Sequence, residues 1–296
     1  MPTNQNLPTR RYEQQYAGIF ATVFGVQAAF SGALAPIQIL DGVQENAKAF
    51  SVKTNATPVV IGEEYLKGEN DGGFGDGSGA GSRFGDVTEI KYQNTDVEYD
   101  YELTIHEGLD RYTVNNDFQA AIADRLKLQS EAQTRRVSKR VGKYLSDNAG
   151  KAEALADFTE ENVKALFNTV SAYYINNEVT APVTIYLRPE LYNAIIDMTA
   201  NTSAKGSSVS IDNNGLARYK GFALVETPAQ YFDTGVVGIF SPDNIAIPFV
   251  GISTARTIEA TNFDGVLLQA AAKGGTYTLD DNKKAIVKVT GTVVGG

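Results

Sequence analysis

Alternating polar and apolar residues mark two segments as candidate β-strands, Ala49–Lys53 and Glu89–Tyr92. β-Branched and aromatic side chains with a period of two are typical of strands. The segment between them, Gly68–Gly85, is too rich in glycine for a helix or a packed strand. The pattern therefore predicts a long two-stranded ribbon with a glycine-rich loop at its tip. Because an isolated ribbon is only marginally stable in water, we expect it to lie on another surface, and a neighbouring chain is the natural candidate.

Apolar residues near helical spacing predict a long helix that ends at Ser146, before Gly150. They are Phe118, Ile122, Leu126, Val137, Val141 and Tyr144. Asn115 and Asn116 are suitable N-cap residues, and Asp117 would favour the positive end of the helix. The other face of the helix is basic, with Arg125, Lys127, Arg135, Arg136, Lys139, Arg140 and Lys143 set against Glu131.

Helix and strand patterns alternate after Lys151, which is typical of an α/β lobe. Helices are expected from a cap at Thr159 through Tyr174 and from Pro189 through Met198. Strands are expected over Val183–Leu187, Phe222–Val225 and Val236–Phe240. From Ile252 to Val294 we expect strand-like segments separated at Gly265, at Gly274 and Gly275, and at Asp280–Asn282.

The longest apolar run is Ala17–Ala35, which follows two arginines and imitates a signal peptide. Polar residues separate the arginines from the run and interrupt it, and it is barely long enough to span a membrane. Phe20, Phe24 and Ala28 share four-residue spacing, which favours an amphipathic helix that needs a covering surface.

The composition removes several classes of function. The 296 residues include 26 basic and 35 acidic side chains, a net charge of −9, which is unlike a simple basic DNA-binding protein. Without cysteine there are no disulfides, thiolate metal ligands or cysteine nucleophiles. The single histidine, His106, excludes poly-histidine zinc sites. We expect no catalytic, cofactor-binding or metal-binding residues, and no enzyme.

Three motifs have simpler structural explanations than chemical ones. Gly68–Gly85 is not followed by the Gly-Lys-Ser/Thr of a phosphate loop, and a strand-like segment rather than a helix comes after it. Gly72–Asp76 resembles a calcium β-roll repeat, but it occurs once. His106 lies near Glu107 and Asp110 without a recognisable nucleophile, so a hydrogen-bonded structural role next to a turn is expected.

Charge is distributed unevenly along the chain. Residues 63–110 are strongly acidic, with Lys67, Arg83 and Lys91 as their cations, whereas the following helix is basic. Across a boundary between two copies, such complementarity would set orientation and register more than affinity. The alternative that each charged face is simply hydrated stays open, because exposed ion pairs contribute little.

The order of an arm, a ribbon, a long helix, an α/β lobe and terminal strands resembles the major capsid proteins of tailed bacteriophages of the Hong Kong 97 type. Gly73–Gly85, His106–Asp117 and Ala121–Leu126 are similar to stretches in capsid proteins of phages of lactococci and streptococci. Tyr186–Asn193 and Tyr219–Pro228 resemble strands of the family's axial domain. The resemblance covers nearly the whole chain.

This resemblance implies an α+β, Hong Kong 97-type capsid fold with four parts. They are an N-terminal arm at 1–49, an extended loop at 50–110, a peripheral domain at 111–157 and 251–296 that contains the spine helix at 115–147, and an axial domain at 158–250. The implied function is a structural major capsid protein that self-assembles, first as a procapsid, into the icosahedral head shell around packaged double-stranded DNA.

The resemblance also implies partners and a location. Identical subunits would form hexamers and pentamers and meet a portal protein. A separate scaffolding protein is expected because the arm starts almost at Met1, and a decoration protein is a further partner in some shells. Packaged DNA would be touched by weak, non-specific contacts, with no membrane. The protein would reside in the virion capsid after assembly in the host bacterial cytoplasm, and no motif specifies a cross-link between subunits.

Two groups of residues are expected to contact neighbouring subunits. Those in the loop are Glu63, Glu64, Lys67, Glu69, Asp71, Phe74, Asp76, Arg83 and Phe84. Those on the spine helix are Arg125, Arg135, Arg136, Lys139, Arg140 and Lys143.

Two alternative functions stay open. An α/β-fold enzyme would need a pocket with convergent ionisable groups in 158–250, and a secreted cell-surface β-protein would have a mature chain that begins at Pro36.

Overall fold

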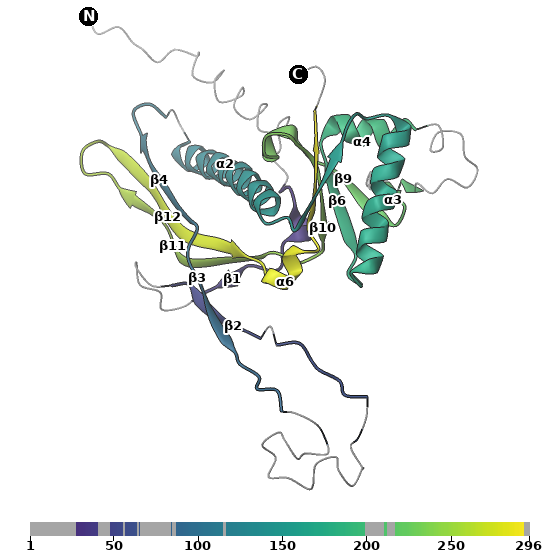
Figure 1. Ribbon diagram of the computed structural model, residues 1–296. Coiled ribbons are helices and arrows are strands. Elements are labelled where there is room, and N and C mark those ends of the chain that lie inside the picture. The colour runs from purple at the N-terminus through teal and green to yellow at the C-terminus, as the bar shows by residue number, and fades with distance from the viewer. Residues whose placement is uncertain are drawn as a thin grey trace, which may run out of the picture. The chain divides into compact units, whose positions relative to one another are not determined.

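A computed structural model describes residues 28–40, 48–55, 57–63, 65, 84, 87–114, 117–198, 210–211 and 217–292 (Figure 1). The chain divides into two compact units. Residues 1–41 and 100–296 form the larger unit, called the body here, and residues 42–99 form the smaller, called the ribbon unit. Both helices and strands are present, in agreement with the predicted α+β class.

A seven-stranded mixed sheet forms one half of the body, in the order β5-β13-β10-β6-β9-β8-β7. β5 pairs with β13 and β6 with β9 in parallel, whereas the other pairs are antiparallel. Every residue of the central strand β10 is buried, as expected for a strand covered on both faces. The strands are β5 (Lys151–Leu155), β6 (Val183–Leu187), β7 (Ser210–Ile211), β8 (Ala217–Tyr219), β9 (Phe222–Glu226), β10 (Val236–Pro242) and β13 (Val287–Gly291).

Each face of this sheet carries its own core. Helices α3 (Glu160–Asn176) and α4 (Pro189–Ile196) cover one face, where Phe167 and Ile185 are fully buried. The opposite face packs against the C-terminal half of α2 (Phe118–Asp147) and the short helices η1 (Ser31–Ala33) and η2 (Ala229–Tyr231). Ile185 and its neighbour Tyr186 enter different cores because successive side chains of a strand point to opposite faces.

The other half of the body is a four-stranded sheet in the order β1-β11-β12-β4, with α2 lying over it (Figure 1). Long strands β11 and β12 form an antiparallel hairpin, and β4 pairs with β12 along its whole length. The elements are β1 (Gln38–Ile39), β4 (Tyr101–Asp110), β11 (Ile247–Glu259) and β12 (Gly265–Tyr277), followed by α6 (Asp280–Lys283). Strand β4, which falls within the loop proposed at 50–110, is therefore part of the body sheet.

The ribbon unit contains one antiparallel pair, β2 (Phe50–Thr54) and β3 (Gln93–Val97), in register from Phe50 opposite Val97 to Thr54 opposite Gln93. The first strand was predicted within one residue, but the second lies after Glu89–Tyr92. Ile90 and Tyr92 are instead 61% and 68% exposed in a segment without regular secondary structure. The glycine-rich tip at 66–83 lies outside the described residues.

Sequence patterns predicted the long helix and both helices of the lobe to within two residues, with three local corrections. The N-cap is Asp117, whose side chain accepts the Ala120 N–H at 3.0 Å, while residues 115–116 are outside the described part. Gly274 and Gly275 do not interrupt a strand, because they lie within β12 beside the rings of Tyr101 and Phe249. His106 is an exposed residue in the middle of β4 rather than beside a turn.

Among the described helices, none combines the length and the apolar composition needed to cross a membrane. The leading segment at 1–27 lies outside the described residues, so the amphipathic helix expected around Phe20 and Phe24 is not among the elements above.

Candidate functional site

The most unusual surface lies in the ribbon unit. Val59, Val60 and Ile61, called the aliphatic segment here, are 88%, 75% and 83% exposed. Within the described part of the ribbon unit, Val97 is the one buried hydrophobic side chain. Exposed aliphatic clusters of this kind mark interaction surfaces.

Only part of the predicted loop contact can be located. Glu63 is exposed next to the aliphatic segment, and Phe84 is 85% exposed with its ring 5.3 Å from that of Tyr65. Glu64, Lys67, Glu69, Asp71, Phe74, Asp76 and Arg83 lie outside the described residues. Near the base of the ribbon, Asp96 forms an ion pair with Lys48 and accepts a hydrogen bond from Ser51 at 2.5 Å, which lowers the pKa of its carboxyl.

In the body, the basic face of α2 meets acids of its own chain. The Arg125 guanidinium donates to both carboxylate oxygens of Glu107 at 2.6 and 2.5 Å. The nearly buried side chain of Gln129 donates to the same carboxylate at 2.6 Å. The hydrogen bonds from Arg125 and Gln129 lower the pKa of Glu107 to about 2. This bidentate pair attaches α2 to strand β4.

A second arginine, Arg140, attaches α2 to the beginning of β4. It donates to the backbone oxygen of Asp100 at 2.8 Å and to the carboxylate at 2.9 Å. Its guanidinium carbon lies 4.3 Å from the ring centroid of Tyr101. Arg125 and Arg140 are slightly more than four helical turns apart, so the two contacts hold α2 along most of β4.

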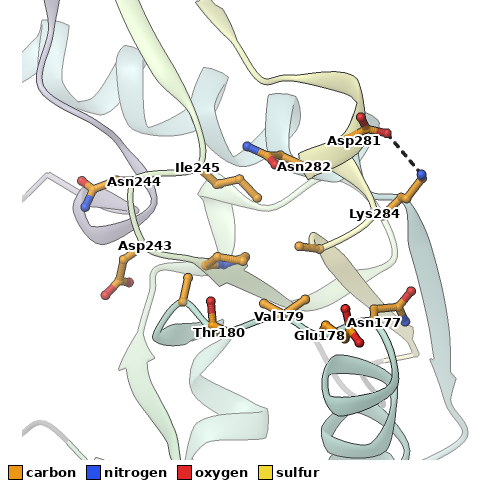
Figure 2. Close-up of a pocket in the computed structure, with 13 residues that line it drawn as sticks. Asn177, Glu178, Val179, Thr180, Asp243, Asn244, Ile245, Asp281, Asn282 and Lys284 are labelled. Carbon is orange, nitrogen blue, oxygen red and sulfur yellow. Dashed lines mark hydrogen bonds and ion pairs between the residues drawn. The ribbon is translucent and has the colours of Figure 1, made fainter. Parts of the chain in front are cut away.

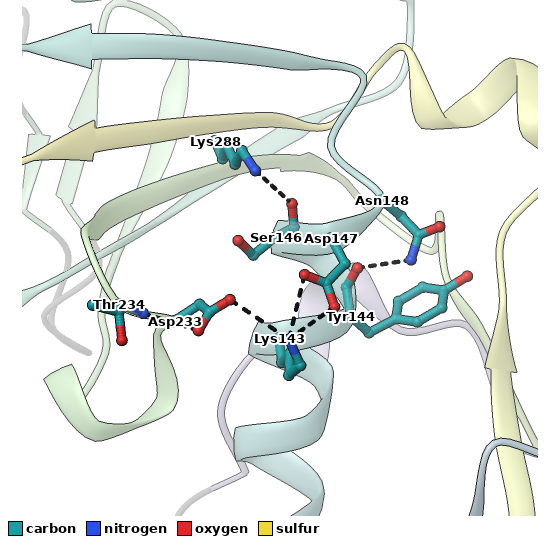
Figure 3. Close-up of polar contacts among 8 residues, drawn as sticks. All are labelled: Lys143, Tyr144, Ser146, Asp147, Asn148, Asp233, Thr234 and Lys288. Atoms are coloured by element: carbon teal, nitrogen blue, oxygen red, sulfur yellow. Dashed lines mark hydrogen bonds and ion pairs between the residues drawn. The ribbon is translucent and has the colours of Figure 1, made fainter.

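At the C-terminal end of α2, Lys143 Nζ lies 3.1 Å from Asp147 and 3.7 Å from Asp233 (Figure 3). Lys288 donates to the backbone oxygen of Ser146 at 3.3 Å, and the Asn148 side chain donates to that of Tyr144 at 2.9 Å. Both bonds satisfy carbonyl groups that a helix end leaves without partners. The contacts fix this end of α2 to the seven-stranded sheet.

Three of the six predicted contact residues of the helix, Arg125, Arg140 and Lys143, therefore have partners within the chain. The charge analysis expected such acids across a boundary between copies. Asp100 and Glu107 were counted there with the ribbon, but β4 pairs with β12 and brings both acids beside α2 of the same chain. Whether any of the six residues also touches a neighbouring copy stays a prediction.

The other three predicted residues form a separate cluster. Arg135, Arg136 and Lys139, called the basic cluster here, are exposed and have no ion-pair partner among the residues that the structure describes. They lie within about one turn of α2, so their charges add at one place.

The body also contains a cavity of about 360 Å³, between the end of α3, the loop after β10 and α6 (Figure 2). Val179, Ala181, Pro242 and Ile245 contribute apolar lining. Of its charged groups, Lys284 pairs with Asp281 at 3.3 Å, and Asp243 accepts a hydrogen bond from Thr184 at 2.9 Å. No group of three or more metal-binding side chains occurs in the described parts of the chain.

Sequence reasoning missed the attachment of the arm to the body. Phe30 is 1% exposed, with its ring 4.9 Å from that of Tyr186 and 5.7 Å from that of Phe232. The backbone N–H of Ala29 donates to Ser138 of α2 at 3.2 Å. Cleavage before Pro36, which the secreted alternative requires, would remove Phe30 from this core. In the sequence, burial of the arm is indicated only by Phe30 and the small residues that follow it, Ser31-Gly32-Ala33.

Comparison with known proteins identifies the fold. No protein-family model and no curated protein sequence matches the chain. Among solved structures, the mature capsid of bacteriophage PhiM1 matches with a TM-score of 0.65 and 10% identity, over 92% of this chain and 89% of that chain. A structure from Mycobacterium phage Adephagia matches with a TM-score of 0.62 and 13% identity, over 94% of both chains. The capsid of cyanophage P-SCSP1u matches with a TM-score of 0.60 and 12% identity, over 91% of both chains.

These matches extend over nearly the whole chain, so they concern the arrangement of both sheets and the long helix rather than one shared motif. The fold expected from the resemblance is confirmed. The chain has the fold of tailed-bacteriophage major capsid proteins of the Hong Kong 97 type.

Proposed function

We propose that this chain is the major capsid subunit of a tailed phage and that many identical copies form an icosahedral shell around double-stranded DNA. The observation that carries the proposal is the aliphatic segment, whose three side chains are at least 75% exposed on a single chain. The matching fold of phage capsid subunits supports the same conclusion.

In the proposed shell, the ribbon unit of each copy lies on a neighbouring copy. Full burial of Val59, Val60 and Ile61 would contribute about 1.5 to 3 kcal/mol for each side chain, whereas an exposed ion pair contributes about 0 to 1 kcal/mol. The aliphatic segment therefore drives the contact. Repeated around a closed shell, contacts of this size suffice for stable assembly.

The basic cluster would orient this contact. None of its three cations forms an ion pair with an acid among the residues that the structure describes. Glu63, an exposed acid, lies next to the aliphatic segment. Acids of a neighbour's ribbon are the proposed partners, and the charges would set register and rate of association more than affinity.

The remaining assignments belong to the same proposal. Residues 111–157 and 251–296 would form the peripheral domain and 158–250 the axial domain, within hexamers and pentamers in the virion. A portal protein, a separate scaffolding protein, in some shells a decoration protein, and weakly held packaged DNA would be further partners. The role is structural rather than enzymatic.

Electron microscopy of the purified chain tests the proposal. We expect shells or capsomers from the wild-type chain and from a conservative variant with Val59→Ile, Val60→Ile and Ile61→Val. A variant with Val59→Ser, Val60→Ser and Ile61→Ser should fold but sediment as single chains, because its segment no longer offers apolar surface. Normal shells from the serine variant would contradict the bridging role.

The basic cluster can be tested in the same assay. Arg135→Glu, Arg136→Glu and Lys139→Glu together should slow assembly and make it less sensitive to salt, since long-range attraction is lost. A second variant that adds Glu63→Lys should recover part of the rate. Unchanged assembly kinetics in the charge-reversed variant would show that these cations do not face the ribbon.

A further inference from the structure

The chain passes from the ribbon unit to the body between Tyr99 and Asp100. Asp100 is held by partners that all belong to the body. Its N–H donates to the backbone oxygen of Gly274 at 3.0 Å, and its carboxylate accepts the N–H of Thr276 at 3.3 Å. Its backbone oxygen and the other carboxylate oxygen accept from Arg140 at 2.8 and 2.9 Å. Main chain and side chain of one residue are thus fixed directly after the ribbon unit ends.

Arg140 is well suited to hold Asp100 in place. It is followed by Val141, which is 3% exposed in the core, so the backbone that carries the guanidinium is held firmly. The guanidinium lies over the Tyr101 ring while it donates to Asp100, a combination of stacking and directed hydrogen bonds that lysine cannot reproduce. The side chains of Arg140 and Asp100 are 34% and 41% exposed, so water reaches the pair.

We propose that Arg140 and Asp100 form a clamp that fixes the root of the ribbon unit and limits the directions in which the ribbon can leave the body. Arg140 acts here as a positioning residue, and the clamp requires neither a neighbouring copy nor a shell. The proposal therefore goes beyond the capsid function and stands or falls separately from it.

The clamp has a built-in sensitivity to acid. The groups that face Asp100 are Arg140 and Tyr144 from α2, Tyr101 from β4 and the N–H of Thr276 from β12. Burial raises the pKa of Asp100 above its ordinary value of 3.8, although Arg140 and Thr276 act against this. A proton on the carboxylate removes its charge and leaves Arg140 with the backbone oxygen as its main acceptor. The pair of Glu107 with Arg125 stays ionised in that range, because the pKa of Glu107 is about 2.

Acidification should therefore loosen the root of the ribbon before it loosens the N-terminal half of α2. This order follows from the surroundings of the two acids: Asp100, just before β4, is partly buried, whereas Glu107, in the second half of β4, is held by two hydrogen-bond donors.

Spin-label distance measurements on the unassembled chain test the proposal. The chain has no cysteine, so Asn94→Cys in β3 and Ala172→Cys in α3, both exposed, supply unique labelling sites. We expect Arg140→Gln and Asp100→Asn each to widen the distribution of label-to-label distances, and the double variant to widen it no further, because both changes remove the same contact. Arg135→Gln, which removes a neighbouring arginine outside the clamp, is the matched control and should leave the width unchanged.

A pH series completes the test. On going from neutral pH toward 3.8, the wild-type distribution should widen, whereas that of Asp100→Asn should not change. Thermal unfolding of each variant, with a midpoint within a few degrees of the wild type, excludes general destabilisation as the cause. Equal widths for the wild type, Arg140→Gln and Asp100→Asn would overturn the proposal, and so would equal widening by Arg135→Gln. Shell formation by these variants bears on the capsid function alone.

Discussion

The body and the ribbon unit use hydrophobic residues in opposite ways. In the body, large side chains such as Phe167, Leu145 and Phe240 have no exposed surface, and they lie in two cores on either side of one sheet. In the described part of the ribbon unit, Val97 alone is buried, while Val59 and Ile61 are more than 80% exposed. The large side chains of the body are covered within the chain, whereas the aliphatic segment of the ribbon unit is left exposed. Stability and assembly should therefore depend on different residues.

The largest expected effect is in the body, at the arm. Phe30→Ala removes a ring that is 1% exposed and leaves a cavity between Tyr186 and Phe232. We expect a loss of about 3 to 5 kcal/mol in the free energy of unfolding, measured by denaturant titration. Phe30→Leu should lose distinctly less. A loss below about 1 kcal/mol for the alanine variant would show that the arm is not part of this core.

Next comes Gly142, in the buried half of α2. A Cβ at this position would overlap the backbone oxygen of Tyr231 and lie 3.0 Å from the Phe30 ring. Alanine in an open helix would stabilise by about 1 kcal/mol, so the sign of the change reports the packing. We expect Gly142→Ala to destabilise by about 1 to 3 kcal/mol. In the ribbon unit, a Cβ added at Gly62 would have no atom beyond the adjoining residues within 4 Å, and Gly62→Ala should have almost no effect on the same measurement.

A smaller effect should follow from the ion pair of Glu107 with Arg125. The pKa of Glu107 is about 2 in the folded chain against an ordinary value of 4.5, so the pair stabilises fully above 4.5 and loses its contribution as pH falls toward 2. Glu107→Gln should cost about 1 kcal/mol at neutral pH, because the pair is partly exposed. Unfolding curves at several pH values should show a shallower acid dependence for this variant than for the wild type.

The smallest expected effect on stability is in the ribbon unit. Replacing all three residues of the aliphatic segment by serine should change the free energy of unfolding of the unassembled chain by less than about 0.5 kcal/mol, since these side chains touch little within one chain. A loss comparable with that of Phe30→Ala would mean that the segment packs within its own chain, and the contrast between the two units would be lost.

Much of this fold was readable from the sequence because its signals are local. The 3.6-residue periodicity gave α2, and short β-branched runs gave β6, β9 and β10 within a few residues. What failed depended on distant neighbours. Gly274 and Gly275 look like a strand break, but they accommodate the rings of Tyr101 and Phe249 within β12. Burial of Phe30 needs Tyr186 and Phe232, which lie far along the chain.

The basic face of α2 was predicted from the sequence, but the acids beside Arg125, Arg140 and Lys143 in their own chain were not. A basic helix after an acidic segment indicates attraction, and composition alone does not say whether the acids belong to the same copy. The pairing of β4 with β12 decides this for Asp100 and Glu107. For the basic cluster, the partner is still a prediction.

The most direct measurement is side-chain footprinting of Val59, Val60 and Ile61 with a carbene reagent, in the unassembled chain and in purified particles. If the aliphatic segment bridges copies, labelling should be high in the single chain and fall severalfold in the particle, while labelling of fully buried Phe167 stays low in both. Equal labelling of the segment in the two states would contradict the claim that neighbouring copies cover the ribbon.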